Sequence, residues 1–302
     1  MKRIITALSG ISMRLSLLIW ISVSPLPLVA QDEASEDEGI KPVRAPFESS
    51  WIIDNQTVVV PEKGTLEVMI QHRFGVVSNG ITDLWGIYAP GNIRLGLSYS
   101  LFSNLGFGGM KGPLSIGVGS TKDNRLQDVN LKYAFLQQTR NGRIPVSVTY
   151  YGNAVIETVK PQEQLPNRNS SDRLSYFHQI IISRKFSEKL SVQVAPSLSH
   201  YNVVAPEMMN DHIAVALAGR YRFSAQSSVI FNVDQPITIH KFYNPQPSVS
   251  FGLEVSTSSH AFQIFATNFD AIVPQRNNVY NQNDPWGDGF LIGFNITRLW
   301  SF

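Results

Sequence analysis

Apolar side chains alternate with small or polar ones through most of this 302-residue chain. In the C-terminal stretch GFLIGFNITRLWSF, every second residue from Phe290 to Phe302 is aromatic or branched apolar, with the single exception of Arg298. The residues between them are mostly small or polar. A period of two is that of a β-strand, whose successive side chains point to opposite faces. Because no helical period persists for more than a turn or two, we expect a chain built almost entirely of strands.

The same alternation predicts twelve strands after residue 62. Their sequences are TLEVMIQHRF, NIRLGLSYSL, PLSIGVGS, DVNLKYAF, PVSVTYYGNAVI, LSYFHQIIISRKF, LSVQVAPSLSHY, IAVALAGRYRF, SVIFNVD, SVSFGLEVS, HAFQIFATN and the terminal stretch. Connectors after even-numbered strands are mostly tight. The first tight turn is expected at Ser103 and Asn104, and the following LGFGGMKG is not placed by the pattern. Connectors after odd-numbered strands are longer and rich in proline, asparagine and aspartate.

An even strand count, with short turns at one end and longer loops at the other, is typical of a transmembrane β-barrel. Strands of nine to eleven residues suit a tilted crossing of a bilayer about 25–30 Å thick. The predicted fold is therefore all-β: a 12-stranded antiparallel transmembrane β-barrel over residues 63–302, with short periplasmic turns and longer extracellular loops. A sandwich or jelly roll would also alternate, but its connections need not be short at one end only.

The first sixty residues carry different signals. Lys2 and Arg3 precede an apolar run that is too short to span a bilayer, and a proline break leads to Ala30, so residues 1–30 are predicted to be a cleaved signal peptide rather than a retained anchor. Residues 31–45 form an acidic leader expected to be disordered. Residues 46–62 are expected to be a periplasmic or lumen-plugging segment. We therefore expect export to the outer membrane of a Gram-negative bacterium.

Charge and cysteine content exclude several classes of protein. Without the signal peptide the chain is near neutral, which gives no electrostatic basis for binding nucleic acid. The sequence contains no cysteine, which excludes disulfides, thiol catalysis, cysteine-based metal sites and an N-terminal lipid-modified cysteine. We expect no cofactor.

The strand face opposite the apolar one is predicted to line the lumen, and it carries charges of both signs. The predicted lumen-lining charged residues are Glu67, Arg73, Arg94, Lys132, Arg220, Arg222, Asp234 and Glu254. In an open pore they would favour anions weakly, whereas in a closed barrel they would cross-link the wall through hydrogen-bonded networks. We favour a narrow or partly plugged lumen. The segment PFESSWIIDNQTVVVP is the candidate plug, because it is too apolar for water and too irregular for a lipid-facing strand.

Several strands end on an aromatic residue followed by serine. Aromatic residues at one height around a barrel form an interfacial girdle. The predicted girdle residues are Phe102, Phe186, Phe223 and Trp300. The terminal Phe302 is predicted to be part of a C-terminal signal read by the barrel-assembly machinery, which with outer-membrane lipid is the expected partner. Arg298 is expected at the interface, where its charge costs little.

Two alternative chemistries have weak support. A phospholipase-like site would need a serine bonded to a histidine. In SLSHYN, however, Ser199 and His200 are adjacent and point to opposite faces, and Ser258 with His260 lies at a predicted turn. In PEMMNDH, Met208, Met209, Asp211 and His212 could hold copper, but two methionines in a short loop are more often packing, so we expect no metal and no catalytic residue.

Several stretches resemble a known family. They are KGTLEVMIQHRFG, NIRLGLSYS, RIPVSVTYYGNA, DRLSYFHQIIISRKFSEKLSVQVAPSLSHYN, AGRYRF and WGDGFLIGFNITRLW. They are similar to an uncharacterised family of Bacteroidota outer-membrane barrels, domain of unknown function 5777, spread over most of residues 63–302; the region around GGMKGP departs from it. The resemblance implies an outer-membrane barrel but no activity, substrate or catalytic residue.

The sequence thus predicts an integral outer-membrane β-barrel protein, either a narrow channel for a small solute or a structural barrel with an occluded lumen. The alternatives are an outer-membrane lipid-acting enzyme of the phospholipase kind and a secreted soluble β-barrel that binds an apolar ligand.

Overall fold

The computed structural model describes residues 41–107, 109–159 and 169–302. The predicted signal peptide, residues 1–30, and the predicted leader as far as residue 40 lie outside the described residues. Within the described ranges, no helix is both long enough and apolar enough to cross a membrane.

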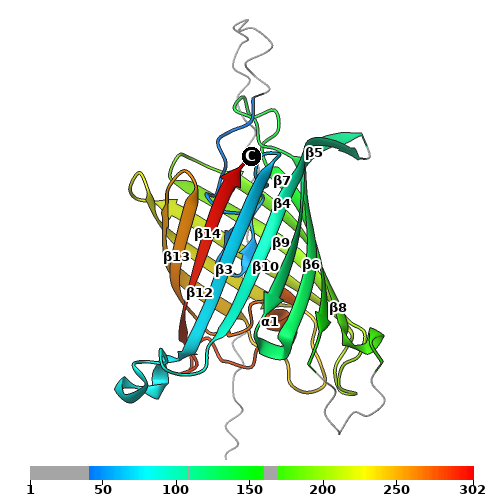
Figure 1. Cartoon of the computed structure of the whole chain (residues 1–302), viewed down its shortest axis with the longest axis vertical. Helices are drawn as coiled ribbons and strands as arrows, with labels where there is room; N and C mark the ends of the chain where they lie inside the picture. Colours follow the sequence, from blue (N-terminus) through cyan, green and yellow to red (C-terminus); the bar gives the residue numbers. More distant parts are fainter. Residues whose placement is uncertain (1–40, 108, 160–168) are drawn as a thin grey trace, which may run out of the picture. The chain divides into compact units, whose positions relative to one another are not determined.

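Twelve antiparallel strands of the described chain, β3 to β14, form one closed barrel (Figure 1). They are β3 (Thr65–Val76), β4 (Asn92–Phe107), β5 (Met110–Thr121), β6 (Leu126–Leu136), β7 (Ser147–Glu157), β8 (Leu174–Lys185), β9 (Leu190–Tyr201), β10 (Asp211–Arg222), β11 (Ser227–Pro236), β12 (Ser248–Ser256), β13 (His260–Thr267) and β14 (Leu291–Ser301). The prediction of a 12-stranded antiparallel barrel is confirmed.

The C-terminal strand closes the barrel. Strand β14 pairs with β13 on one side and with β3 on the other, from Leu291 opposite Val76 to Ser301 opposite Thr65. The backbone N–H of Phe302 continues this pairing by donating to Gly64 O at 3.2 Å. No edge of the apolar terminal strand is therefore left unpaired, which removes the usual route to edge-to-edge aggregation.

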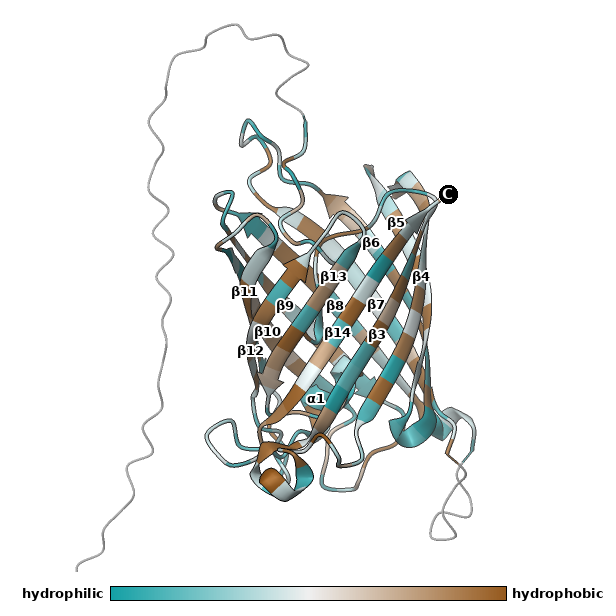
Figure 2. Cartoon of the chain, turned by 60° about the vertical axis from the view of Figure 1, so that its left-hand side comes forward, coloured by the Kyte–Doolittle hydropathy of each residue, from teal (hydrophilic) through white to brown (hydrophobic). Residues whose placement is uncertain are grey.

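The alternation in sequence becomes an alternation between lumen and outer wall. In β12, Ser250 and Glu254 are buried, whereas Phe251 and Leu253 are 61% and 48% exposed. Figure 2 shows the same alternation of hydrophilic and hydrophobic residues along the strands. An outer wall of exposed large apolar side chains around a polar interior is the distribution found in barrels that face lipid.

The turn between β4 and β5 differs from the prediction. Strand β4 continues through Ser103 and Asn104 to Phe107, so the tight turn predicted at those residues is wrong, and the chain reverses beside Gly109, whose φ is 82°. Register shifts between Ser100 and Phe102, and between Phe102 and Leu105, accommodate extra residues as β-bulges. Because bulges break the period of two, the alternation could not follow this strand.

Connector lengths follow the predicted asymmetry with two departures. Loops 77–91, 202–210, 237–247 and 268–290 are long and lie at the end opposite the C-terminus. At that same end, however, β5 and β6 are joined only by the short 3-10 helix η3 (Asp123–Arg125), in which Asn124 and Arg125 are left-handed. At the other end, connector 137–146 is long and pairs with residues 41–43 of the predicted leader. Pairing thus orders this end of the leader. The other 3-10 helices are η1 (Val77–Asn79), η2 (Ile81–Asp83) and η4 (Ser171–Arg173).

Residues 47–59, called the inner segment below, lie inside the barrel. They include a small antiparallel ribbon, β1 (Trp51–Ile52) and β2 (Asn55–Gln56), and every residue from Ser49 to Val58 is buried. At the loop end, helix α1 (Pro274–Tyr280) also turns into the barrel and buries Gln275, Asn277, Asn278 and Val279 (Figure 1). The interior is therefore occupied from both ends.

Candidate functional site

The structure places the eight predicted lumen-lining charged residues in two different settings. The side chains of seven of them are buried among the described residues: Glu67, Arg73, Arg94, Lys132, Arg220, Asp234 and Glu254. The eighth, Arg222, lies at the end of β10, where it is half-buried and pairs with the exposed Glu188 of the β8–β9 turn at 3.6 Å. Seven charged groups in a narrow interior require partners, and most of those partners come from outside the list.

Arg94 and Asp128 form a bidentate ion pair across three neighbouring strands. Arg94 Nε and Nη2 donate to the two carboxylate oxygens of Asp128 at 2.9 and 2.7 Å, and Nη1 donates to Gln71 Oε1 at 3.1 Å. Both side chains of the pair are almost completely buried. Gly119 lies between them on β5, where an added Cβ would fall 2.2 Å from both Arg94 and Asp128. The pair therefore depends on a glycine at position 119, because a side chain there would occupy the space between the two charged groups.

Asp54 joins the inner segment to both the wall and the helix. Arg73 Nη2 lies 3.4 Å from Asp54 Oδ1, and both side chains are buried. The amide of Asn277, on α1, donates to the other carboxylate oxygen of Asp54. Burial raises the pKa of Asp54 to about 7, although the Arg73 guanidinium acts to lower it. The carboxylate of Asp54 thus joins the inner segment to strand β3 through Arg73 and to helix α1 through Asn277.

Asn55 of the inner segment contacts a second cluster of polar wall residues. Its amide donates to Asn232 Oδ1 and to both Asp234 oxygens at 2.8 Å, and its own oxygen accepts from Gln179 at 2.9 Å. Asn232 also donates to Asp234 at 2.7 Å. The buried carboxylate of Asp234 therefore receives amide hydrogen bonds rather than a cation.

The start of the inner segment binds the charges nearer the C-terminal end of the barrel. Ser50 Oγ donates to Glu67 at 2.6 Å, while its backbone oxygen accepts from Lys132 at 2.9 Å. Arg220 contacts Glu48 at 2.9 Å and Glu254 at 3.1 Å. These contacts distribute two cations and three carboxylates around a few residues of one segment.

Wall side chains also satisfy the backbone of the inner segment. Asn295 donates to Ile53 O at 2.6 Å, Gln193 to Gln56 O at 2.7 Å, and Thr149 to Val58 O at 3.0 Å. Gln263 accepts from Ile53 N and donates to Trp51 O, both at 3.0 Å. Because a buried backbone group without a partner is costly, these polar wall residues allow an irregular segment to remain inside the barrel.

An apolar cluster also joins the inner segment to the wall. Its members from the inner segment are Phe47, Ile52, Ile53 and Val58. They pack against wall residues of the lumen phase, which include Tyr151, Phe177, Ile181, Ile230 and Phe265. These wall positions interrupt the otherwise polar lumen face. Burying each inner-segment side chain contributes roughly 1.5–3 kcal/mol to holding it in place.

The predicted girdle and terminal residues lie on the outside. Their exposed fractions are Phe102 44%, Phe186 58%, Phe223 54%, Trp300 37% and Phe302 88%. Arg184 lies over the ring of Phe186 at 5.2 Å and Arg298 over the ring of Trp300 at 4.6 Å. Each arginine thus has an aromatic neighbour two residues further along the chain.

The residues of the alternative chemistries lie in separate surroundings. Ser199 is buried, whereas His200 lies on the outer side and bonds Asp211 at 2.8 Å. His260 contacts Ser259 rather than Ser258. His212 bonds the backbone oxygen of Met209 at 2.6 Å. In the described part of the chain, no group of three or more histidine and carboxylate side chains could hold a metal ion.

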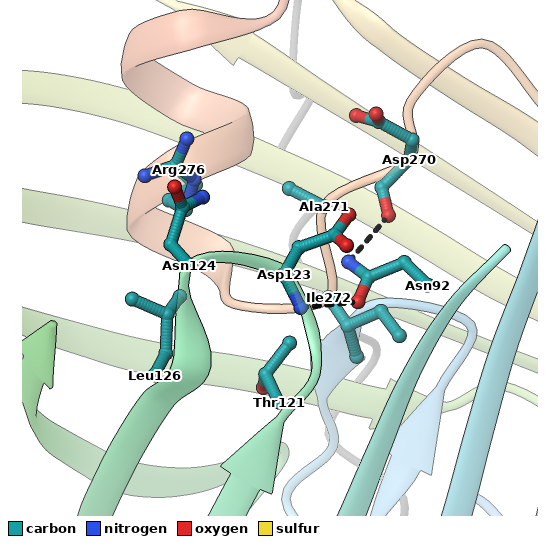
Figure 3. A pocket seen from close by; sticks show the side chains of 9 residues that line it. All are labelled: Asn92, Thr121, Asp123, Asn124, Leu126, Asp270, Ala271, Ile272 and Arg276. Carbon is teal, nitrogen blue, oxygen red and sulfur yellow. Dashed lines mark hydrogen bonds between the residues drawn. The ribbon is translucent and has the colours of Figure 1, made fainter. Parts of the chain in front are cut away.

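A polar pocket of about 270 Å³ opens between the β4 and β5 ends and the segment leading into α1 (Figure 3). Asn92 connects the β5–β6 turn to the segment leading into α1: it donates to Asp270 O at 3.0 Å and accepts from Asp123 N at 3.2 Å. Ile272 and Leu126 are buried at its lining. Burial, with a further contribution from Asp270, raises the pKa of Asp123.

Sequence reasoning missed Asp128, Asp54, Glu48 and the residues of α1. Asp128 has the same strand phase as Lys132, so the alternation alone could have identified it. Asp54 and Glu48 belong to a segment without a regular period, and α1 lies within a loop too polar to predict a buried helix. Their partners could be found only from the closed barrel.

The chain matches a family of membrane barrels and is similar to several solved porin and channel structures. A family model described as a membrane-bound β-barrel domain, domain of unknown function 5777, matches residues 47–300. No curated protein matches the chain. Among solved structures, the NanC porin is similar at 12% identity and a TM-score of 0.45, with 78% of this chain and 98% of that chain covered. The KdgM porin is similar at 8% identity and a TM-score of 0.44, with 79% of this chain and 99% of that chain covered. An outer membrane channel from Pseudomonas putida F1 is similar at 10% identity and a TM-score of 0.46, with 80% of this chain and 97% of that chain covered.

Proposed function

The chain belongs to the family of membrane-bound β-barrel domains called domain of unknown function 5777, and we propose that it is an outer-membrane channel for a small solute, closed in the described state by its own inner segment. The polar lining of the lumen supports this proposal. The wall binds the inner segment mainly through amide, hydroxyl and charged groups that water or a polar solute could also satisfy. Opening requires the inner segment to move towards the periplasmic end, from which it enters.

The apolar cluster favours a second candidate, a structural barrel that stays occluded. Phe47, Ile52, Ile53 and Val58 pack as they would in the core of a soluble protein. Together their burial contributes several kcal/mol against withdrawal. A channel of this design would therefore be closed most of the time and would open when a pull or a partner offsets that cost.

A reversible disulfide tests whether the inner segment controls passage. Ser49 Oγ and Thr297 Oγ1 are 3.1 Å apart, so Ser49→Cys with Thr297→Cys would tether the segment to β14, and the chain has no other cysteine. In planar bilayers we expect the oxidised protein to show no current steps, and reduction to restore them. The matched control is Thr65→Cys with Ser301→Cys, 3.3 Å apart across the β3–β14 seam, which tethers only the wall.

Each outcome is informative. Equal conductance before and after reduction of the Ser49–Thr297 tether would refute gating by the inner segment. If neither the tethered proteins nor the unmodified protein ever conducts, although all are folded, the structural barrel is the better assignment.

A further inference from the structure

The pocket of Figure 3 carries opposite charges on opposite sides. The guanidinium of Arg276 lies on the α1 side, and the carboxylates of Asp123 and Asp270 lie on the other side. No ion pair of Arg276 occurs among the described residues; its side chain lies 5.4 Å from the ring of Tyr280. The three charged groups thus share one cavity without neutralising one another by direct contact.

The walls of this pocket are held in place by uncharged groups. Asn92 is buried and its two hydrogen bonds fix both the turn that carries Asp123 and the backbone of Asp270. Asn124 occupies the left-handed position of the turn, with φ 55°, and its amide is directed to the same side of the pocket as Arg276. No side-chain hydrogen bond of Asn124 is found in the described part of the chain, so its amide is available to a ligand.

A small zwitterion matches this arrangement better than a singly charged ion. A cation alone would leave the guanidinium of Arg276 without a partner, and an anion alone would face two carboxylates. Since a water molecule occupies about 30 Å³ in the liquid, a cavity of about 270 Å³ has room for a molecule of amino-acid size.

We propose that this pocket binds a small zwitterion of the amino-acid class, with its ammonium group at Asp123 and Asp270 and its carboxylate at Arg276. The proposal deepens the proposed channel function by naming the class of solute that meets the extracellular mouth. Two of the lining residues, Leu126 and Ile272, are buried. Because the inner segment occupies the lumen, the solute would bind at the loop end of a closed barrel.

Calorimetry on the purified full-length protein in detergent tests this with three matched probes: L-alanine, ethylamine and propionate. Ethylamine is alanine without its carboxylate, and propionate is alanine without its ammonium group. We expect alanine to bind at least about tenfold more tightly than either, because each charge-assisted contact is worth about that much. Arg276→Gln and Asp123→Asn should each weaken alanine binding by about tenfold.

The matched control variant is Arg125→Gln, which removes a charge from the same turn without lining the pocket. It should leave alanine binding within about twofold, since exposed charges contribute little. Alanine that binds no more tightly than ethylamine and propionate would overturn the proposal, as would unchanged affinity in both pocket variants. If the protein binds alanine but never conducts, the binding site is supported and the channel function is contradicted. If it conducts but does not bind alanine, the channel function is supported and the binding site is contradicted.

Discussion

Single residues in the lumen act in pairs that the strand phase alone does not reveal. The phase assigns Arg94 to the interior, but its stability there comes from Asp128 at 2.7 Å, two strands away. Removing one partner of such a buried pair is costly, whereas the net contribution of the intact pair is small. Substitutions at positions that leave room for the pair should therefore destabilise the protein as much as substitutions of the charged residues themselves.

Gly119→Ala should destabilise the barrel by about 1–3 kcal/mol, because the new Cβ would lie 2.2 Å from both Arg94 and Asp128 and must displace them. The measurement is urea unfolding of the refolded protein in detergent. Gly106→Ala is the matched control: it lies in β4, where an added Cβ meets nothing within 4 Å, and should change stability by less than about 0.5 kcal/mol. Equal effects of the two substitutions would contradict a crowded ion pair.

Asp54 makes stability depend on pH. Its pKa is raised to about 7 in the folded protein, so the folded state binds a proton more readily than the unfolded chain. This contribution is fully present below pH ~4 and is lost as the pH rises to about 7, with a total on the order of a few kcal/mol. The unfolding free energy of the wild type, minus that of Asp54→Asn, should therefore fall between these pH values. A difference that stays flat, or that rises, would show that Asp54 is ionised throughout.

At the scale of elements, the regular strands were predictable and the irregular segments were not. Alternation placed β12 and β14 well because every residue of β12 and most residues of β14 obey the period of two. It failed in β4, where bulges near Phe102 shift the register, and it could not assign α1, whose buried asparagine and glutamine side chains resemble those of an exposed loop. The inner segment was recognised only as too apolar for water; its partners, such as Gln263 and Asn295, come from distant strands.

The end of β14 gives a prediction that separates assembly from stability. Phe302 is 88% exposed, and it contributes only a backbone hydrogen bond, to Gly64. Deleting Phe302 should therefore leave the unfolding temperature of refolded protein almost unchanged but reduce its level in the outer membrane of cells. Arg298→Ala, which removes a side chain lying over Trp300 at the outer wall, is the control and should affect neither quantity. Normal membrane levels of the shortened protein would contradict an assembly signal.

At the scale of the whole molecule, the barrel and its contents form one electrostatic system. Arg73 is paired with Asp54, Arg220 with Glu48, and Glu67 with Ser50, so wall charges on several strands depend on residues that precede the first barrel strand. The hydrogen bonds of the strand ladder are independent of those residues. The barrel can therefore close without its contents, and the Arg94–Asp128 pair stays within the wall, but the charges that contact the inner segment lose protein partners.

A chain that begins at Lys63 should consequently fold into the same barrel but with altered stability and permeability. Water would enter the lumen and hydrate Arg73, Lys132 and Asp234, which compensates part of the lost pairing but none of the lost apolar burial. We expect an unfolding temperature lower than that of a chain beginning at Lys41, which keeps every contact described above, together with steady rather than intermittent conductance. If the two chains unfold at the same temperature and neither conducts, the inner segment is neither a stabilising element nor the barrier, and the obstruction must come from α1 alone.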